Sequence, residues 1–312
     1  MKGRDPKTLL AMTVVCATGC AFDQTELPPL PDEVLHYGQE AGENGGNGGN
    51  GGGNGGGGCT REEPELPEFG ASDGLLSGTW ARRLVLKTER DTRNSGEWRD
   101  SSWTVFELVT VLHAGTRLRE VVEVCDISMG VIDGATTGFP DAFINNLPIL
   151  VEDGTFLSGG DGVGAAYRDP GPFVRLYGLA PEAAAKPWEK CDSYFNPENL
   201  AAECPIALWP EITDMDCDGN VGVTLDMTVG TAATEQVFMV QRDVMTRLGA
   251  VKSADRIDGT ITLEENNANL GSTKAMLKSN PPSRVVEGSA FVMTRIAEGA
   301  ACSAVMGAAF DE

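Results

Sequence analysis

The stretch 42–58 consists almost entirely of glycine and asparagine. Glycine loses more backbone entropy on folding than any other residue, and neither residue type buries much apolar surface, so this stretch is not expected to fold. It lies inside a longer segment, residues 20–73, which holds eleven Asp or Glu residues and a single basic residue, Arg61. Gly-rich and Pro-rich chains form flexible or extended connections. We therefore expect residues 20–73 to be a disordered tether and residues 74–312 to form the folded domain.

The first nineteen residues have the pattern of an export signal. Three basic residues, Lys2, Arg4 and Lys7, precede an apolar stretch of twelve residues, 8–19. A transmembrane helix needs about 20 apolar residues, so this stretch is too short to span a bilayer. We expect residues 1–19 to be a signal peptide that is removed on export. Cleavage at another position is the alternative.

The end of this segment, Ala17-Thr18-Gly19-Cys20, resembles the lipobox of bacterial lipoproteins. The family usually has Leu where this chain has Ala17. The resemblance implies that Cys20 carries a diacylglycerol, and two acyl chains give the double anchor that stable attachment to a lipid bilayer requires. Ala21 follows in place of the Asp that retains such proteins at the inner membrane. An outer-membrane lipoprotein, on the periplasmic side or at the cell surface, is therefore implied.

The chain is strongly acidic, with a formal net charge of −22 and a pI near 4.4. The tether supplies close to half of this charge, because it has eleven acidic residues and one basic residue. Phosphate binding needs clustered Lys and Arg, so nucleic acid is not an expected partner.

The domain sequence is dominated by runs of β-branched and aromatic residues, which favour strands. The runs 103–112 and 116–127 are separated by Ala114-Gly115 and predict a hairpin. Which face of the first run is buried stays open, because both faces carry apolar residues. Other predicted strands are 80–87, Phe173–Tyr177, 221–227, 235–242, 258–264 and Ala290–Arg295. One short helix, Asp141–Asn146, is predicted between a Pro–Asp start and Pro148.

About eight strands with hairpin-like spacing predict an all-β fold, either a single antiparallel up-and-down β-barrel or a sandwich, with one short helix. Gly78-Thr79-Trp80 resembles the G-x-W motif of lipocalins, in which the Trp closes one end of the barrel. The resemblance implies a lipocalin-like barrel with a buried Trp80.

A broader similarity, over most of residues 75–305, is to a set of uncharacterised bacterial surface lipoproteins. The shared motifs are D-x-D-x-D-G-N-x-G-V-T at 214–224, V-x-Q-R at 240–242, R-I-D-G at 256–259 and F-V-M-x-R at 291–295. This similarity implies a fold and a location, and no activity.

The segment 214–222 places Asp at alternate positions before a glycine, as calcium loops do. The twelfth position, where an EF-hand has a bidentate Glu, is Leu225, and an acid follows one residue later. The pattern fits either a short extracellular calcium loop or a solvated β-turn, and both readings stay open. The candidate calcium ligands are Asp214, Asp216, Asp218, Asn220 and Asp226.

Without the signal peptide and Cys20, six cysteines remain, which in an exported chain favours three disulfides. Cys125 with Cys302 would join the early and late parts of a barrel, and Cys191 with Cys204 would close a local loop. Cys59 and Cys217 would then form the third pair. The alternative is that some of these cysteines bind zinc, but the sequence has no C-x-x-C motif.

The sequence has no recognised catalytic motif. Its two histidines are His36, in the tether, and His113, so few side chains are suited to act as a general base near neutral pH. We expect a non-catalytic binding or structural module whose partner is a small apolar ligand or an envelope protein. The alternatives are a calcium-dependent module that contacts surface polysaccharide or protein, and a hydrolase that uses carboxylates alone.

Overall fold

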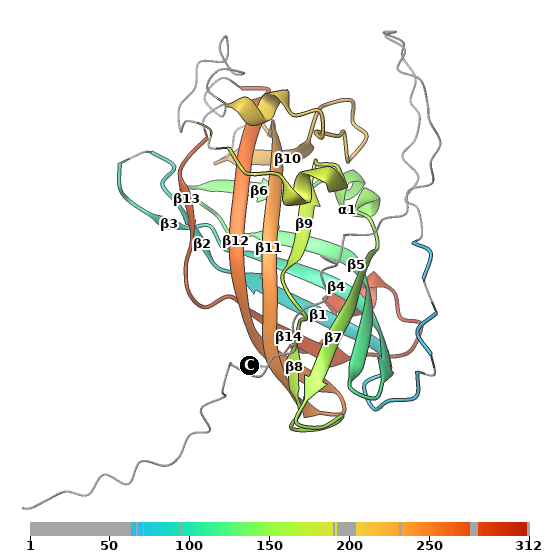
Figure 1. Cartoon of the computed structure of the whole chain (residues 1–312). Helices are drawn as coiled ribbons and strands as arrows, with labels where there is room; N and C mark the ends of the chain where they lie inside the picture. The colour runs from blue at the N-terminus through green and yellow to red at the C-terminus, as the bar shows by residue number, and fades with distance from the viewer. Residues whose placement is uncertain are drawn as a thin grey trace, which may run out of the picture. The chain divides into compact units, whose positions relative to one another are not determined.

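The computed structural model describes residues 64–310, apart from residues 67, 71, 94, 190, 192–203, 231–232 and 275–279, and antiparallel strands dominate this part (Figure 1). The described residues belong to the unit Leu35–Glu312, one of two units in the chain. The predicted signal peptide, Cys20 and most of the tether lie outside the described residues. No helix within the described ranges has the length and apolar character to cross a membrane.

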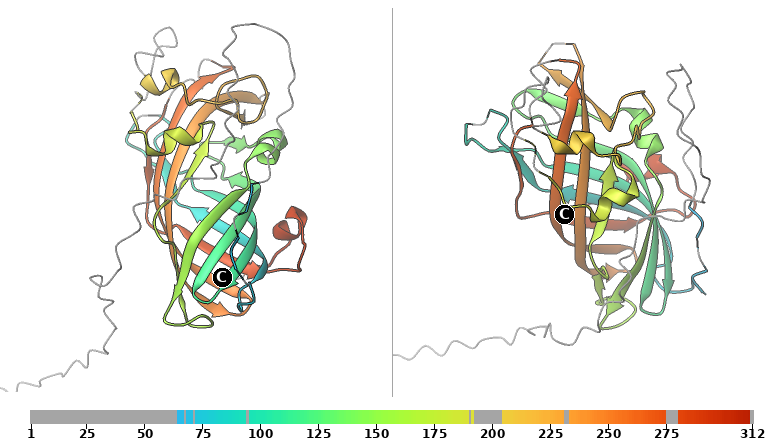
Figure 2. Two further views of the ribbon diagram at one scale, coloured as in Figure 1. Left: turned by 45° about the vertical axis from the view of Figure 1, so that its right-hand side comes forward. Right: turned by 45° about the horizontal axis from the view of Figure 1, so that its top comes forward.

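Eight strands of the main sheet form a ring in which each strand pairs antiparallel with the next, and the last pairs with the first (Figures 1 and 2). In ring order they are β1 (Gly78–Leu86), β4 (Trp103–Ala114), β5 (Arg117–Met129), β7 (Leu150–Ser158), β8 (Ala166–Arg168), β11 (Glu235–Ser253), β12 (Arg256–Ser272) and β14 (Ala290–Arg295). This order is also their order along the chain. The predicted all-β fold of antiparallel up-and-down strands is confirmed.

The ring is not a simple eight-stranded barrel, because further strands branch from β11. β9 (Phe173–Tyr177) and β10 (Val223–Val229) both pair with β11, and β6 (Ala135–Gly138) pairs with β10. A separate small sheet contains β13 (Ser283–Val285), β2 (Thr88–Arg90) and β3 (Arg99–Asp100).

The helical segments are short. The predicted helix is confirmed as α1 (Asp141–Asn146), and a second α-helix, α3 (Cys302–Met306), was not predicted. Two short 3₁₀ helices lie between β9 and β10 in the chain. They are η2 (Pro181–Ala185), which follows β9, and η4 (Pro205–Leu208), which precedes β10.

The predicted hairpin is β4 paired with β5. The face of β4 that carries Trp103, Val105 and Val109 is buried, which settles the choice that the sequence left open. Glu107 lies on this same buried face and is completely inaccessible to solvent. A charged residue therefore projects into the protein interior from the middle of an apolar strand.

β11 and β12 form a hairpin much longer than the predicted strands 235–242 and 258–264. Gly249 and Gly259 face each other across the two strands. A Cβ atom on Gly259 would lie 2.2 Å from the carbonyl oxygen of Leu248, so only glycine permits this close approach. Glycines inside a strand pattern weaken the local signal, which explains why the sequence indicated shorter strands.

Trp80 is completely buried at the start of β1, and its Nε1 donates a hydrogen bond to the carbonyl of Leu76 at 2.9 Å. The guanidinium of Arg295 lies 4.5 Å from the centre of the Trp80 ring. Arg295 also donates to the carbonyl oxygens of Ser77 and Ala254. This arginine therefore joins the last strand of the ring to the segment before the first strand.

Two of the three disulfides predicted from the sequence are seen in the described residues. Cys125–Cys302 connects β5 to α3 across 177 residues, and Cys191–Cys204 closes a local loop of 13 residues. Cys217 is also disulfide-bonded. Cys59, its predicted partner, lies outside the described residues.

Candidate functional site

The acidic loop, residues 214–222, brings three carboxylates together. One oxygen from each of Asp214, Asp216 and Asp218 lies within 4.8 Å of the other two. Asp214 and Asp218 are exposed, whereas Asp216 is only 3% exposed. The loop therefore has two carboxylates at the surface and one that reaches inward.

The backbone of the loop holds these side chains in place. The carboxylate of Asp214 accepts hydrogen bonds from the backbone N–H groups of Asp218 and Gly219. Thr224 donates its N–H to Asp216 Oδ2 at 2.8 Å and its hydroxyl to Asp218 Oδ2 at 2.5 Å. The start of β10 therefore fixes two of the three acids.

The loop also packs on the neighbouring elements. The N–H of Thr213 donates to the carbonyl of Gly178 at the end of β9, and the Asn146 side chain at the end of α1 donates to the Asp216 carbonyl. Gly222 closes the loop with φ +88°, and a Cβ there would lie 2.4 Å from the Met239 carbonyl oxygen. Close packing against β11 therefore requires glycine at position 222.

Asp216 is the residue of the loop whose surroundings point most directly to a bound cation. Its Oδ1 is buried and has no hydrogen-bond partner within the described residues. Burial, together with the nearby charges of Asp218 and Asp214, raises the pKa of Asp216. A buried carboxylate oxygen without a donor is costly, and a bound cation is one way in which proteins satisfy it.

Two of the five predicted calcium ligands, Asn220 and Asp226, do not place an oxygen in the three-carboxylate group. The side-chain amide of Asn220 donates its N–H to Asp218 Oδ2, so its nitrogen faces the acidic group. Asp226 is on β10, opposite Gln236, and is not part of the three-carboxylate group. The structure thus brings together Asp214, Asp216 and Asp218. Their oxygens are the hard donors that Ca²⁺ prefers, and the orphan oxygen of Asp216 fits such an ion.

A buried charged cluster inside the ring was not predicted. Arg82 on β1 is completely buried and donates to Glu107 at 2.5 Å, to Glu120 at 2.5 Å and to Glu152 at 3.0 Å. These acids come from β4, β5 and β7. One arginine therefore connects three neighbouring strands of the ring.

Two more arginines complete this cluster, which we call the buried network. Arg175 binds Glu107 and Glu152, and Arg247 binds Glu120, Glu152 and Asp169. The hydroxyl of Tyr167 donates to Glu120. The buried network consists of Arg82, Arg175, Arg247, Glu107, Glu120, Glu152, Asp169 and Tyr167.

The buried network contains four carboxylates and three guanidinium groups. Burial, the largest cause, raises the pKa of Glu120 to about 7, although the charge of Arg82 acts in the opposite direction. Glu152 adds to the upward shift through its charge and a hydrogen bond. Burial acts to raise the pKa of Glu152 as well, but the charges of Arg82 and Arg175 outweigh it and lower that pKa. The two carboxyls therefore shift in opposite directions, and Glu120 is the one that takes up a proton more readily.

The buried network changes what the ring interior can hold. Arg82 projects from the same face of β1 as Trp80, because alternate residues of a strand share a face. Apolar ligands do not replace charge-assisted hydrogen bonds, so an apolar ligand beside Trp80 would leave buried charges unpaired. This part of the ring is packed by its own side chains.

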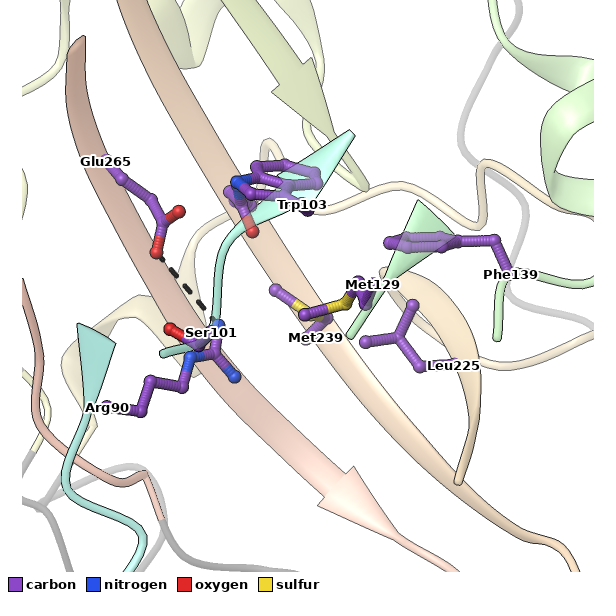
Figure 3. Close-up of a pocket in the computed structure, with 9 residues that line it drawn as sticks. Arg90, Ser101, Trp103, Met129, Phe139, Leu225, Met239 and Glu265 are labelled. Carbon is purple, nitrogen blue, oxygen red and sulfur yellow. Dashed lines mark ion pairs between the residues drawn. The ribbon is translucent and has the colours of Figure 1, made fainter. Parts of the chain in front are cut away.

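A small hollow lies elsewhere, around Trp103 at the start of β4 (Figure 3). Its enclosed space is about 10 Å³, close to the room that one water molecule needs. We call it the Trp103 hollow. It is lined by Arg90, Ser101, Trp103, Met129, Phe139, Leu225, Met239, Gln241 and Glu265.

His113 has a structural position. It is 1% exposed; its Nδ1 accepts the N–H of Leu76 at 3.1 Å, and its Nε2 lies 2.7 Å from the carbonyl oxygen of Gly115. The neutral tautomer with hydrogen on Nε2 satisfies both contacts. Both ring nitrogens are thus engaged in holding the segment before β1 against the β4–β5 turn.

Comparisons with known proteins gave no match: no family model fits the chain, and neither the curated proteins nor the solved structures contain a significant relative. The functional argument therefore depends on the residues and geometry described above.

Proposed function

We propose that this chain is a lipid-anchored lipoprotein of the outer membrane or cell surface, whose β domain is a non-catalytic binding and structural module with a calcium-stabilised loop. The calcium-stabilised loop is supported by the orphan Oδ1 of Asp216, buried beside the carboxylates of Asp214 and Asp218. Calcium at this position would join the start of β10 to the ends of α1 and β9, because the loop contacts both. The lipid anchor is supported by the lipobox-like segment Ala17-Thr18-Gly19-Cys20.

The exposed position of Asp214 supports a second, related candidate. A calcium ion bound between one buried and two outer carboxylates keeps coordination positions toward solvent, since Ca²⁺ takes six to eight oxygen ligands. Hydroxyl groups of a surface polysaccharide could occupy these positions. Calcium-dependent contact with polysaccharide is therefore the alternative role of the same loop.

A carboxylate-based hydrolase is not supported. Glycoside hydrolysis needs two carboxyl groups that face a substrate in a cleft. The closely grouped carboxylates of the buried network are instead bonded to arginines inside the ring. His113 is buried, and both of its ring nitrogens are engaged in contacts with the backbone.

Calcium titration of the purified domain tests the loop. With the dissociation constants of about 0.1 to 1 mM that are typical of extracellular sites, 5 mM Ca²⁺ should stabilise the protein by about 1 to 2 kcal/mol. Asp216→Asn should abolish this gain, whereas the matched variant Asp226→Asn should keep it. Calorimetry and thermal melting measure both. An absence of binding heat and of any melting shift in the wild type would remove the calcium site.

Fatty-acid labelling tests the anchor. Cells expressing the full chain should incorporate labelled palmitate into the protein, and Cys20→Ala should abolish the label and release the protein from the membrane fraction. The matched variant Cys16→Ala, which lies before the expected cleavage point, should keep both. Unchanged labelling of the Cys20 variant would refute the anchor without affecting the calcium result.

A further inference from the structure

The disulfide of Cys217 connects the acidic loop to a cysteine that lies before the folded domain in the chain. Cys217 is disulfide-bonded, and the other four cysteines of the described residues are bonded to one another in two pairs. The whole chain has eight cysteines. The partner of Cys217 is therefore Cys16, Cys20 or Cys59, and all three precede the first described residue.

Of these three cysteines, Cys59 suits the bond best. Cys16 lies in the predicted signal peptide, and the sulfur of Cys20 is the expected site of the acyl chains. Neither sulfur is open to a disulfide in the mature, anchored chain. Cys59 directly follows the Gly/Asn-rich stretch 42–58 and has no other expected role. In an exported chain, a cysteine of this kind favours a disulfide over a free thiol.

The chain enters the ring at the end opposite to the acidic loop. Arg295 donates hydrogen bonds to the carbonyl oxygens of Leu75 and Ala254, so the entry segment lies beside the turn between β11 and β12. The residue that follows the acidic loop pairs instead with Met239, near the other end of β11. Met239 and Ser253 are 14 positions apart on this strand, which is about 45 Å along it. The acidic loop and the start of the ring are therefore far apart.

The chain between Cys59 and Gly74 is long enough to join these two ends. Its 15 steps reach about 50 Å when the chain is nearly extended. The described part, from Pro64 onward, runs lengthwise outside the ring and is drawn in blue (Figures 1 and 2). Phe69 lies over the guanidinium of Arg119 at 4.8 Å, and this outward-facing residue of β5 is only 4% exposed. The contact holds the segment against the outer wall of the ring.

We infer that Cys217 is bonded to Cys59, and that residues 59–73 form a strap along the outer wall of the ring. The tether then leaves the domain beside the acidic loop, and not at Gly74, where the chain enters the ring. Only residues 21–58 lie between the acylated Cys20 and this second attachment point. The strap is independent of the proposed calcium site, and its relation to the membrane rests on the proposed anchor.

Reduction opens the strap. A dithiol such as dithiothreitol gives two electrons and two protons to the disulfide, which becomes the thiols of Cys59 and Cys217, while the dithiol closes to its own disulfide. Cys217 is partly exposed, so its sulfur is open to attack. After reduction the tether is joined to the domain through the backbone at Gly74 alone. The connection to Cys20 is then longer by the 15 residues of the strap.

Trypsin provides the test, because Arg61 is the only Lys or Arg between Cys20 and Gly74. Limited digestion of the purified full chain should cut after Arg61, between the disulfide and the domain. Without a reductant, the fragment that ends at Arg61 should stay bound to the domain, and the intact mass should be that of the uncut chain plus one water. Dithiothreitol should separate the two pieces. Separation without a reductant would overturn the inference.

Two variants locate the bond. Cys59→Ser should release the fragment on digestion without any reductant, because the strap has lost its attachment. Arg61→Gln is the matched control: it keeps the disulfide, lacks the cleavage site and should remain one piece even after reduction. Attachment that survives digestion in Cys59→Ser would assign the bond to Cys20 and overturn the inference. The result with the wild-type chain depends on neither variant.

Isolated membranes connect the strap to the proposed anchor. Trypsin alone should leave the domain in the membrane pellet, whereas trypsin together with dithiothreitol should release it to the supernatant. A domain that is soluble before digestion would contradict the anchor and leave the result with the purified chain unaffected. Release by trypsin alone would overturn the strap and leave the anchor intact.

Discussion

Arg82 binds three carboxylates at once, those of Glu107, Glu120 and Glu152. Its three partners are fully or almost fully buried, and each reaches it from a different strand. Such a cluster is expensive to desolvate, so its presence does not by itself imply high stability. Once formed, however, it depends on every member, because removal of one charge leaves the others buried and unpaired.

Replacing Arg82 should therefore be severely destabilising. Arg82→Met is expected to lower the free energy of unfolding by about 3 to 5 kcal/mol, since Glu107 and Glu120 would lose a shared buried cation. Arg99→Met is the control: its side chain is 50% exposed, and its surface pairs should contribute less than about 1 kcal/mol. Urea unfolding of both variants gives the comparison. A loss of similar size in the two variants would contradict the special role of the buried network.

The raised pKa of Glu120 predicts how the free energy of unfolding depends on pH. Its pKa is about 7 in the folded protein against 4.5 ordinarily, so between these values the folded state holds a proton that the unfolded state has released. The contribution of Glu120 to stability is therefore greatest below about pH 4.5, falls as pH rises toward 7, and is constant above that. Glu120→Gln should flatten this decline. Urea unfolding from pH 5 to pH 7.5 measures it, and an equally steep decline in the variant would assign it to other groups.

At the scale of elements, the two described disulfides differ in what they constrain. Cys125–Cys302 ties a ring strand to the helix after the last strand, whereas Cys191–Cys204 closes a short loop that lies between β9 and β10 in the chain. In the chain-entropy model a long closed loop restricts the unfolded chain more than a short one.

Removal of the long-range disulfide should accordingly cost more. The double variant Cys125→Ala/Cys302→Ala is expected to lose about 5 kcal/mol and Cys191→Ala/Cys204→Ala about 3 kcal/mol, from sequence separations of 177 and 13. Calorimetric melting of the two double variants provides the measurement. The reverse order would show that native contacts, and not loop entropy, dominate.

The elements also show what the sequence could predict. The β4–β5 hairpin, α1 and both described disulfides followed from local alternation, start and stop residues and cysteine count. The full length of β11 and β12 did not, because Gly249 and Gly259 interrupt the strand pattern although they permit close contact between the strands. The short strand β8 and the single-turn helix α3 leave too few residues for a periodic signal.

The same limits apply to the sites. The spacing of Asp214, Asp216 and Asp218 predicted a cluster, since alternate acids before a glycine converge in one turn. The buried network was beyond local reasoning, because Arg82 and Glu120 are 38 positions apart and meet only when the ring forms. A usable hint existed: Glu107 shares the face of β4 that carries Trp103 and Val105, where a solvated acid is out of place.

At the scale of the whole domain, closure of the ring depends on β14, which pairs with both β1 and β12. A chain that stops after Ser289 lacks this strand and should expose two unpaired strand edges, which promote aggregation. A chain that stops after Gly307 keeps β14 and Cys302 and should behave much like the wild type. Size-exclusion chromatography and limited proteolysis compare them. A soluble, protease-resistant product from the shorter chain would show that closure is dispensable.

The pairing of Trp80 with Arg295 in the β1–β14 register has a consequence for how the molecule is made. The first strand of the ring to be synthesised, β1, has one of its two neighbours in β14, the last strand of the ring. Until β14 is made, one hydrogen-bonding edge of β1 stays unpaired, and a chaperone or the export machinery can hold the nascent chain without competition from a closed ring. Synthesis of β14, and not of β1, is thus what commits the ring to closure.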